Sequence, residues 1–373
     1  MTSIGGAEMV DWNLAVATAT RLVRPGPEVS RDEARAVVAE LRRHAKASEQ
    51  HVRGFTRMGT DDIHDTPILV VDRPGWVRAN VAGFREVLKP LLDKMQERRG
   101  NTPGGAVFGA VGGKVTGVEL GMLLSFLSSR VLGQYETFAP ASRELPAGAK
   151  GGRLLLVAPN IVHVERELDV QPHDFRLWVC LHEETHRTQF TAVPWLRDHL
   201  EGEIQSFLGE TEVDPMTVLE RIREAAQSLA GGRPEGEEED EGRSLVEIVQ
   251  TPAQREILGR LTAVMSLLEG HADFVMDGVG PDVVPSVAEI REKFQQRRAK
   301  GASRLDSALR KLLGLDAKLR QYRDGERFVR AVVEQVGMDG FNRVWTSPNT
   351  LPTKTEIAKP ADWVARVHRK AES

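Results

Sequence analysis

The sequence predicts a predominantly helical α+β fold with one small β-sheet. Apolar residues recur at helical spacing along most of the 373 residues, whereas a few short runs favour strands. With 40% hydrophobic and 28% charged residues, the composition is that of a soluble globular protein with a substantial core. We therefore expect a single domain over residues 10–370.

The first long helix is predicted by its start signal and its apolar stripe. Ser30 has a side chain suited to a helix N-cap, and apolar residues of the segment 31–55 recur on one face. His44 and His51 belong to this segment. We expect both histidines at the surface of the helix.

Two strands and two further helices are predicted before residue 190. The β-branched run at 66–72 predicts a short strand, and Pro74 begins a helix that extends to about residue 98. Residues 154–158 predict a second, buried strand, which the pair Pro159-Asn160 ends. Pro172 is placed as the first-turn proline of the following helix.

Glycine occurs at every fourth position from Gly105 to Gly121. On a helix this spacing makes a stripe without side chains, so a second helix can pack unusually close. A phosphate-binding loop is excluded because Lys114 is followed by Val115 rather than Ser or Thr. Lys114 and Glu119 also interrupt the apolar run, which falls short of the ~20 residues that a membrane span needs. Close packing in a soluble core is the favoured interpretation.

Charge and composition exclude several kinds of partner. The net charge of −4 at pH 7 argues against a nucleic-acid-binding face, and we expect no membrane association. Residues 231–243, "GGRPEGEEEDEGR", are too polar and too acidic to pack, and predict a flexible surface loop. The single cysteine, Cys180, is expected to be a small buried residue and fits a reducing cytoplasm. No secretory signal pattern is present in the first residues, so a cytoplasmic location is expected.

Residues 181–190 read "LHEETHRTQF" and contain the pattern His-Glu-x-x-His. On a helix, His182 and His186 project from one face roughly 6 Å apart, so the two imidazoles can share one metal ion. Glu183 lies about 100° around the helix from His182, near enough to reach a water on that metal but not to bind the metal alongside the histidines. Chance would produce about 0.02 such matches in this composition. The pattern predicts two zinc ligands and a general base.

A catalytic zinc takes three protein ligands and keeps one position open, so a third ligand is expected elsewhere. The segment 266–278, "SLLEGHADFVMDG", predicts a largely buried helix on which Glu269 and Asp273 share a face. His271 points about 200° away from Glu269 on the same helix. We therefore predict Glu269 as the third ligand and Asp273 as a carboxylate that orients a ligand histidine.

Six motifs together give the chain a resemblance to a known family. They are "VLGQYE" (131–136), "LLLVAPNI" (154–161), "HEETHRTQF" (182–190), "EGHADFVMD" (269–277), "QYRDGERFV" (321–329) and "LPTKTEIAKPADW" (351–363). With these motifs the chain resembles the actinobacterial zincin-like metallopeptidases that are often labelled as deazaflavin-cofactor-biosynthesis-associated hydrolases. The resemblance implies a zincin-like architecture that binds one zinc ion, with ligands at His182, His186 and Glu269 and the base at Glu183. In zincin-type sites an exposed strand edge beside the metal can hold an extended substrate, and the strand at 154–158 precedes the motif helix.

The mechanism that we expect is hydrolysis of a peptide bond in a peptide or protein substrate. Zinc activates the water, and Glu183 accepts its proton. A further donor is wanted for the developing oxyanion, and the candidates are Tyr135, Tyr322, His163 or an arginine.

Two alternatives remain open at this stage. The first is a zinc hydrolase of a small-molecule amide, and the second is a zinc-binding scaffold without catalysis. Glu183 argues against the scaffold, because a purely structural zinc site needs no base. The sequence leaves the substrate and the oligomeric state undetermined.

Overall fold

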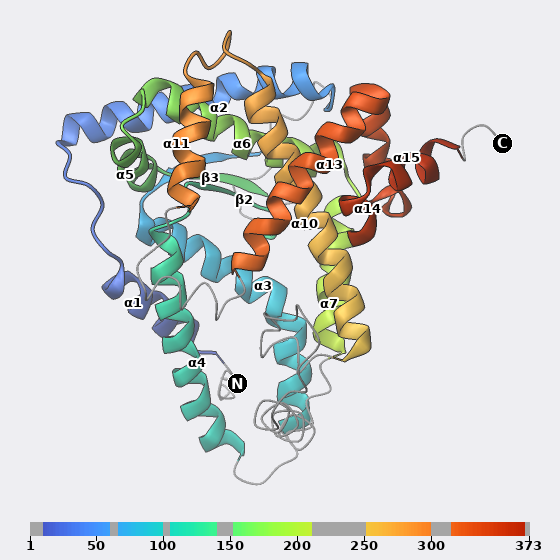
Figure 1. Ribbon diagram of the computed structural model, residues 1–373. Coiled ribbons are helices and arrows are strands. Elements are labelled where there is room, and N and C mark those ends of the chain that lie inside the picture. The colour runs from blue at the N-terminus through green and yellow to red at the C-terminus, as the bar shows by residue number, and fades with distance from the viewer. Residues whose placement is uncertain are drawn as a thin grey trace, which may run out of the picture. The chain divides into compact units, whose positions relative to one another are not determined.

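The computed structural model of the chain describes residues 10–59, 66–99, 105–139, 152–210, 251–299 and 315–369. Within these ranges, the side chains of 94–99, 105–113, 298–299, 315–323 and 369 are not described. Helices dominate the described residues and accompany one three-stranded sheet, which confirms the predominantly helical α+β class (Figure 1). The acidic segment 231–243 lies outside the described residues.

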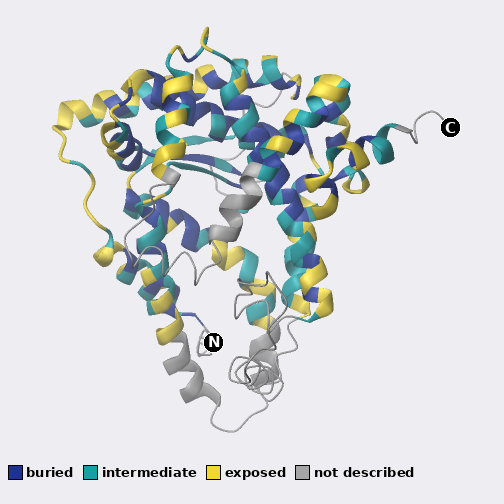
Figure 2. Cartoon of the chain, in the orientation of Figure 1, coloured by how far each residue is buried: buried dark blue, intermediate teal, exposed yellow. Residues whose placement is uncertain are grey.

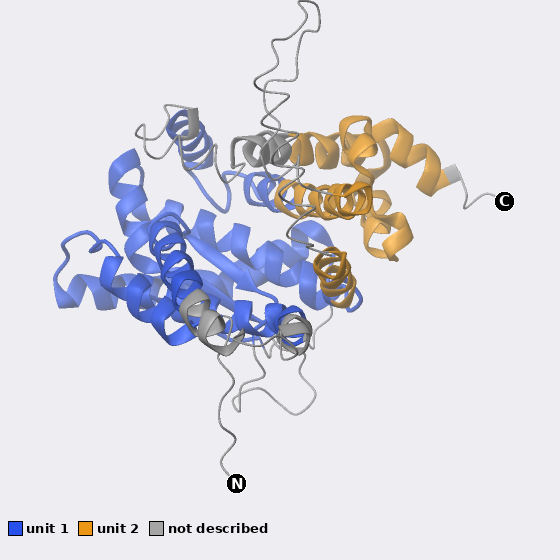
Figure 3. Cartoon of the chain, turned by 90° about the horizontal axis from the view of Figure 1, so that it is seen from below, with its two compact units in different colours: residues 1–197, 271–299 blue, residues 198–270, 300–373 orange. Residues whose placement is uncertain are grey.

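The chain divides into two compact units. Unit 1 contains residues 1–197 and 271–299, and unit 2 contains residues 198–270 and 300–373 (Figure 3). The single domain expected over residues 10–370 stays a prediction.

The sheet of unit 1 has the strand order β1-β3-β2. β1 (Ile68–Val71) pairs in parallel with β3 (Arg153–Val157), and β2 (Gly133–Glu136) pairs antiparallel with the other side of β3. Both strands that were predicted, at 66–72 and 154–158, are confirmed. The exposed edge expected for the second is wrong, because β3 is the central strand and is hydrogen-bonded on both sides. The edge beside it belongs to β2, which was not predicted as a strand.

Helices of unit 1 cover both faces of this sheet (Figure 1). One face is covered by α2 (Arg31–Thr56), α5 (Ala158–Leu168) and α6 (Pro172–Ala192), and the other by α1 (Trp12–Leu22), α3 (Arg73–Arg99) and α4 (Gly105–Ser128). Successive side chains of a strand point to opposite faces, so Leu156 packs with the first group while Leu155 and Val157 pack with the second. The central strand β3 is thus buried on both faces, whereas β1 and most of β2 are only partly buried (Figure 2).

Local signals begin these helices near the predicted positions. The Ser30 hydroxyl accepts a hydrogen bond from the Glu33 amide over 3.1 Å and caps α2. Pro172 is the first residue of α6, as predicted. The chain break expected at Pro159 and Asn160 is instead the first turn of α5, where proline is also tolerated.

The buried side chain of Asn160 has a structural role at this junction. Its Oδ1 accepts a hydrogen bond from Arg73 Nε over 2.7 Å, and its Nδ2 donates to the backbone carbonyls of Ser128 and Val131. It thereby satisfies carbonyls at the end of α4 and ties three elements of unit 1 together.

The two described glycines of the stripe, Gly117 and Gly121, pack closely as predicted, and their partner is α1 with its N-cap. A Cβ on Gly117 would lie 2.6 Å from the Asp11 carbonyl oxygen, and one on Gly121 would lie 2.7 Å from the Ala15 carbonyl oxygen. The two helices therefore contact through their backbones. Within the described residues, no helix is long and apolar enough to cross a membrane.

The surface position expected for His44 is wrong. His44 is 8% exposed, because its face of α2 packs against α6. The sequence did not indicate this burial, because His44 lies among charged residues and the apolar stripe of the helix is complete without it. Cys180 is buried, as predicted.

Unit 2 is helical in its described part. It contains α7 (Leu196–Gly209) from residue 198, the part of α10 (Pro252–Gly278) up to residue 270, α13 (Leu315–Phe341), α14 (Lys354–Ala358) and α15 (Pro360–Arg369). From residue 271, α10 continues within unit 1, which also contains α11 (Val287–Ala299). Thr353 and Glu356 form a capping box at the start of α14, and Arg366 binds the Glu356 carboxylate.

Within unit 2, α10 and α13 touch backbone to backbone. A Cβ on Gly270 would collide with the backbone of Gly325 and Glu326, and a Cβ on Gly325 would collide with the carbonyl of Ser266. Gly270 directly follows Glu269 in the sequence. This contact therefore sets the position of the helix at Glu269.

We expect Gly270→Ala to destabilise the protein, because the added methyl group meets backbone atoms that cannot rotate away. The cost should be about 1–3 kcal/mol, as for overpacked cores. Gly259→Ala is the matched control on the same helix, since nothing lies within 4 Å of its added Cβ, and it should be neutral or stabilising. Chemical denaturation of both variants measures the difference. Equal stability of the two would refute this contact.

Candidate metal centre

The motif helix α6 presents both histidines on one side. The rings of His182 and His186 lie 4.9 Å apart between centroids, and Glu269 is carried by α10. His182 and His186 are half-buried, and so is Glu269. The structure thus places the two predicted histidine ligands of unit 1 together, whereas Glu269 belongs to unit 2 and its role as the third ligand stays a prediction.

The Nδ1 nitrogen of His182 faces side chains of α10. Its Nδ1 lies 3.5 Å from Asp273 Oδ1 and 3.1 Å from Met276 Sδ. The side chains of His182 and Asp273 are 18% and 16% exposed, so the interaction between the carboxylate and the ring is only partly screened by water. A carboxylate at Nδ1 favours the tautomer with the proton there, which leaves the Nε2 lone pair for a metal.

The second histidine, His186, is held by Gln189. His186 Nδ1 lies 2.9 Å from Gln189 Oε1, and the Gln189 amide nitrogen lies 3.1 Å from His271 Nδ1. An amide oxygen can only accept and an amide nitrogen can only donate. His186 therefore donates from Nδ1, which leaves its Nε2 as the ring nitrogen with a lone pair.

His271 completes this chain of contacts from α10. It is fully buried, and burial together with the nearby His186 lowers its pKa to about 3, so the ring is neutral. A neutral ring that accepts at Nδ1 fixes which way the Gln189 amide points. His271 therefore lies behind His186 rather than in a remote part of the core.

The side chain of Glu183 rests on the edge strand. A Cβ on Gly133, the first residue of β2, would lie 2.5 Å from Glu183 Cγ and 2.6 Å from its Cδ. Glu183 is 6% exposed. The absence of a side chain at Gly133 therefore makes the space that the carboxylate occupies beside the two histidines.

The next face of α6 carries a buried ion pair. Arg187 Nη1 lies 3.0 Å from Glu184 Oε2 and 3.8 Å from Glu49 Oε2 of α2. Burial raises the pKa of Glu184 to about 7, against the lowering effect of Arg187. Two adjacent glutamates on one helix thus have different surroundings, because Glu183 faces β2 and Glu184 faces α2.

The three side chains predicted to assist at the oxyanion lie in different places. Tyr135 of β2 stacks on Phe190 with ring centroids 5.5 Å apart, and its hydroxyl fills the space beside Gly152. His163 of α5 is exposed and lies 3.8 Å from Glu167. The side chain of Tyr322 lies outside the described residues. The oxyanion role of these residues stays a prediction.

Sequence reasoning missed three contributors to this centre. Gln189 follows His186 by three residues, so helical spacing could have placed it beside the ring. Met276 could have been found in the same way, one turn after Asp273. Gly133 had no such signal, because its position depends on how β2 pairs with β3.

Comparisons with known proteins assign the chain to a family. A family model described as zincin-like metallopeptidase matches residues 10–364, and the chain therefore belongs to the zincin-like metallopeptidases. A solved structure from Chloroflexus aurantiacus, described as a presumed hydrolase with a novel fold, is 31% identical. The match covers 96% of this chain and 99% of that chain, with a TM-score of 0.67. No curated protein matches the chain. The actinobacterial and deazaflavin parts of the resemblance stay predictions.

We expect Gln189→Met to weaken zinc binding by about 10- to 100-fold, because it removes the acceptor that fixes the His186 tautomer. His271→Leu should weaken binding in the same direction but less, since Gln189 remains. Competition with a chromophoric chelator gives both affinities. The control is Thr191→Val on the same helix, where the hydroxyl bonds to helix carbonyls and affinity should not change. An unchanged zinc affinity of Gln189→Met would show that the Gln189 amide does not orient His186 for metal binding.

Proposed function

We propose that the protein is a zinc-dependent hydrolase, with peptide bonds as its substrate. The observation that carries this proposal is the pair of imidazoles of His182 and His186, with ring centroids 4.9 Å apart on one side of α6, on the same helix as Glu183. Membership of the zincin-like metallopeptidases supports the same reaction class.

The donor set fits zinc by its chemistry. Two imidazoles and one carboxylate are a recurrent ligand set of catalytic zinc, which keeps a fourth position for water or substrate. Nδ1 of each histidine is engaged by another side chain, so Nε2 is the ring nitrogen available to a metal. His182, His186 and Glu269 would hold the ion.

A zinc ion at this position would supply a Lewis acid that lowers the pKa of water to about 7 and polarises the substrate carbonyl. Glu183 then accepts the proton of the attacking water and returns it to the leaving amine. The fit of its side chain against Gly133 restricts the rotamers of Glu183 and holds the carboxylate beside the start of β2.

The neighbouring side chains position this machinery rather than react. Asp273 orients the ring of His182, and Gln189 with His271 orients the ring of His186. Because each contact engages Nδ1, rotation of either ring would break a hydrogen bond or ion pair. Preorganised ligands lose less free energy on binding the metal.

The edge strand β2 supports a peptide as the substrate. In the described sheet β2 pairs with β3 on one side, so its other edge can add an extended chain by main-chain hydrogen bonds. Gly133 at the start of β2 contacts Glu183, so a segment aligned on this edge would pass the proposed base. This role replaces the one expected for the strand at 154–158.

Removal of the proposed ligands tests the metal centre. His182→Ala and His186→Ala should each lower the zinc content by about one ion per chain, and Glu269→Ala should weaken binding severely. Asp273→Ala should weaken it by about 10- to 100-fold, since it acts through His182. Metal analysis and chelator competition measure these effects, with circular dichroism to confirm the fold. Full retention of zinc in both histidine variants would rule out the assignment.

Glu183→Gln tests the reaction. The amide cannot accept a proton, so we expect zinc and fold to be kept while cleavage of a peptide library falls by about 100- to 10,000-fold. Digestion of the library by the wild type should stop with a chelator and return with zinc. If Glu183→Gln loses the metal instead, Glu183 is a ligand and the proposed division of roles is wrong.

Gly133→Ala is a companion to this variant. Its methyl group would displace the Glu183 side chain, so activity should fall with zinc retained. If the wild type cleaves small amides but no peptide in the library, the edge strand has no role in substrate binding. The protein is then a hydrolase of small-molecule amides rather than a peptidase.

A further inference from the structure

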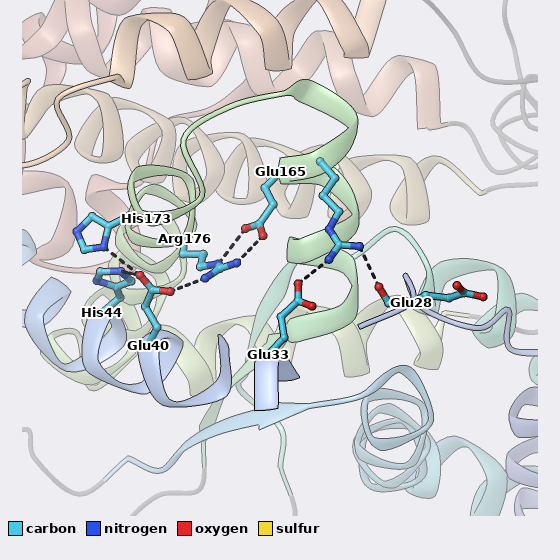
Figure 4. A network of polar contacts seen from close by, with 8 residues as sticks. Glu28, Glu33, Glu40, His44, Glu165, His173 and Arg176 are labelled. Carbon is cyan, nitrogen blue, oxygen red and sulfur yellow. Dashed lines mark hydrogen bonds and ion pairs between the residues drawn. The ribbon is translucent and has the colours of Figure 1, made fainter. Parts of the chain in front are cut away.

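A second group of potential metal ligands lies at the opposite end of α6. It consists of Glu40 and His44, four residues apart on α2, and His173 in the first turn of α6 (Figure 4). One donor atom from each lies within 4.8 Å of the others. All three residues belong to unit 1, and none takes part in the centre described above.

The distances within this group suit a tetrahedral ion. Glu40 Oε1 lies 3.0 Å from His173 Nδ1 and 3.4 Å from His44 Nε2. Zinc with ligand bonds of about 2.0–2.1 Å separates its tetrahedral ligand atoms by about 3.3 Å. The donor atoms would therefore need only small rotamer changes to surround one ion.

The buried member of the group is His44. Its Nε2 is inaccessible to solvent and has no hydrogen-bond partner, although Glu40 Oε1 is 3.4 Å away. A buried polar atom without a hydrogen bond costs about 1–3 kcal/mol. A metal ion bound at Nε2 would remove that cost. Burial and the nearby His173 lower the pKa of His44, so the neutral ring that a metal requires is present at neutral pH.

One oxygen of the Glu40 carboxylate is not bound by the neighbouring arginine, Arg176. Arg176 binds the second oxygen of Glu40 and makes a two-pronged contact with Glu165 (Figure 4). The single guanidinium of Arg176 is thus shared by the two carboxylates of Glu40 and Glu165. With Arg176 on Oε2, the other oxygen of Glu40 faces the two imidazoles.

The group is also reachable from solvent. The side chain of His173 is 63% exposed, whereas that of His44 is 10% exposed. An ion could enter past His173 and keep a water as its fourth ligand. We propose that Glu40, His44 and His173 form a second site for a divalent transition-metal ion of the zinc class.

The consequence of such a site would be structural. Its ligands come from α2 and from the first turn of α6, the helix that carries His182 and His186 further along. A metal bound to the folded state alone stabilises that state by mass action. The ion would therefore fasten the start of the motif helix to α2.

The alternative is a proton in place of the metal. A protonated His173 would donate to Glu40 Oε1 over the same 3.0 Å, and His44 would remain a buried ring without a metal. Both states fit the geometry, so the test must count ions and identify their ligands.

The experiment uses the full chain with His182→Ala and His186→Ala, which removes the first centre. Equilibrium dialysis should show that this protein binds roughly one zinc per chain, and Co²⁺ should give the visible absorption of a tetrahedral nitrogen-oxygen site. His173→Gln added to this background should abolish both signals. Because the side chain of His173 is exposed, the substitution should keep the fold, which circular dichroism checks.

His163→Gln is the matched control, since His163 and Glu167 form an exposed histidine-glutamate pair four residues apart on α5. It should leave binding unchanged. In the wild-type chain, His173→Gln should lower the total zinc content by about one ion, which tests the site independently of the double variant. Absence of zinc and cobalt binding in the double variant, or binding that survives His173→Gln, would overturn the proposal in favour of the protonated pair.

Discussion

Burial of α6 on nearly all sides is the constraint on which the rest of the described structure depends. A helix in this position cannot leave a charged or polar side chain without a partner, because desolvation would cost several kcal/mol. Yet α6 carries Asp174, Glu183, Glu184 and Arg187 among its buried residues. Each of its faces therefore needs a matching element, and the sheet, α2 and α10 supply them.

Each partner gives its face of α6 a different chemistry. Against α2, Glu184 is paired with Arg187, and its pKa of about 7 reflects the burial that this pairing offsets in part. Against β2, Glu183 meets a glycine instead of a cation. Nδ1 of His182 meets Met276 and Asp273 of α10, whereas Nδ1 of His186 meets Gln189 of α6 itself. The difference between a structural glutamate and a proposed base is thus one position along the helix and about 100° of rotation.

Glycines set the distances at which these elements meet. The stripe on α4 lets α1 approach its backbone, and Gly270 and Gly325 do the same for α10 and α13. At Gly133 the missing side chain serves the centre directly, because the Glu183 carboxylate occupies the space. The second proposed metal site combines a donor on α6 with donors from α2.

The sequence by itself determined the local features of this protein. A cap placed α2 and a proline placed α6, the β-branched run placed β1, and the apolar run placed β3. The spacing of His182, Glu183 and His186 put them on adjoining faces of one helix. These features depend on residues within one or two turns, where the periods of helix and strand are fixed by backbone geometry. The Glu269 and Asp273 pair on one face of α10 follows from the same rule.

Only the tertiary structure decided what each of these faces meets. The order β1-β3-β2 made β2 the edge and put Gly133 against Glu183, although their separation along the chain is about 50 residues. The packing of α2 on α6 buried His44 beside His173, where its sequence neighbours had indicated a surface position. The link from His186 through Gln189 to His271 also spans two helices. Such contacts depend on the burial of whole faces, a property that no local spacing contains.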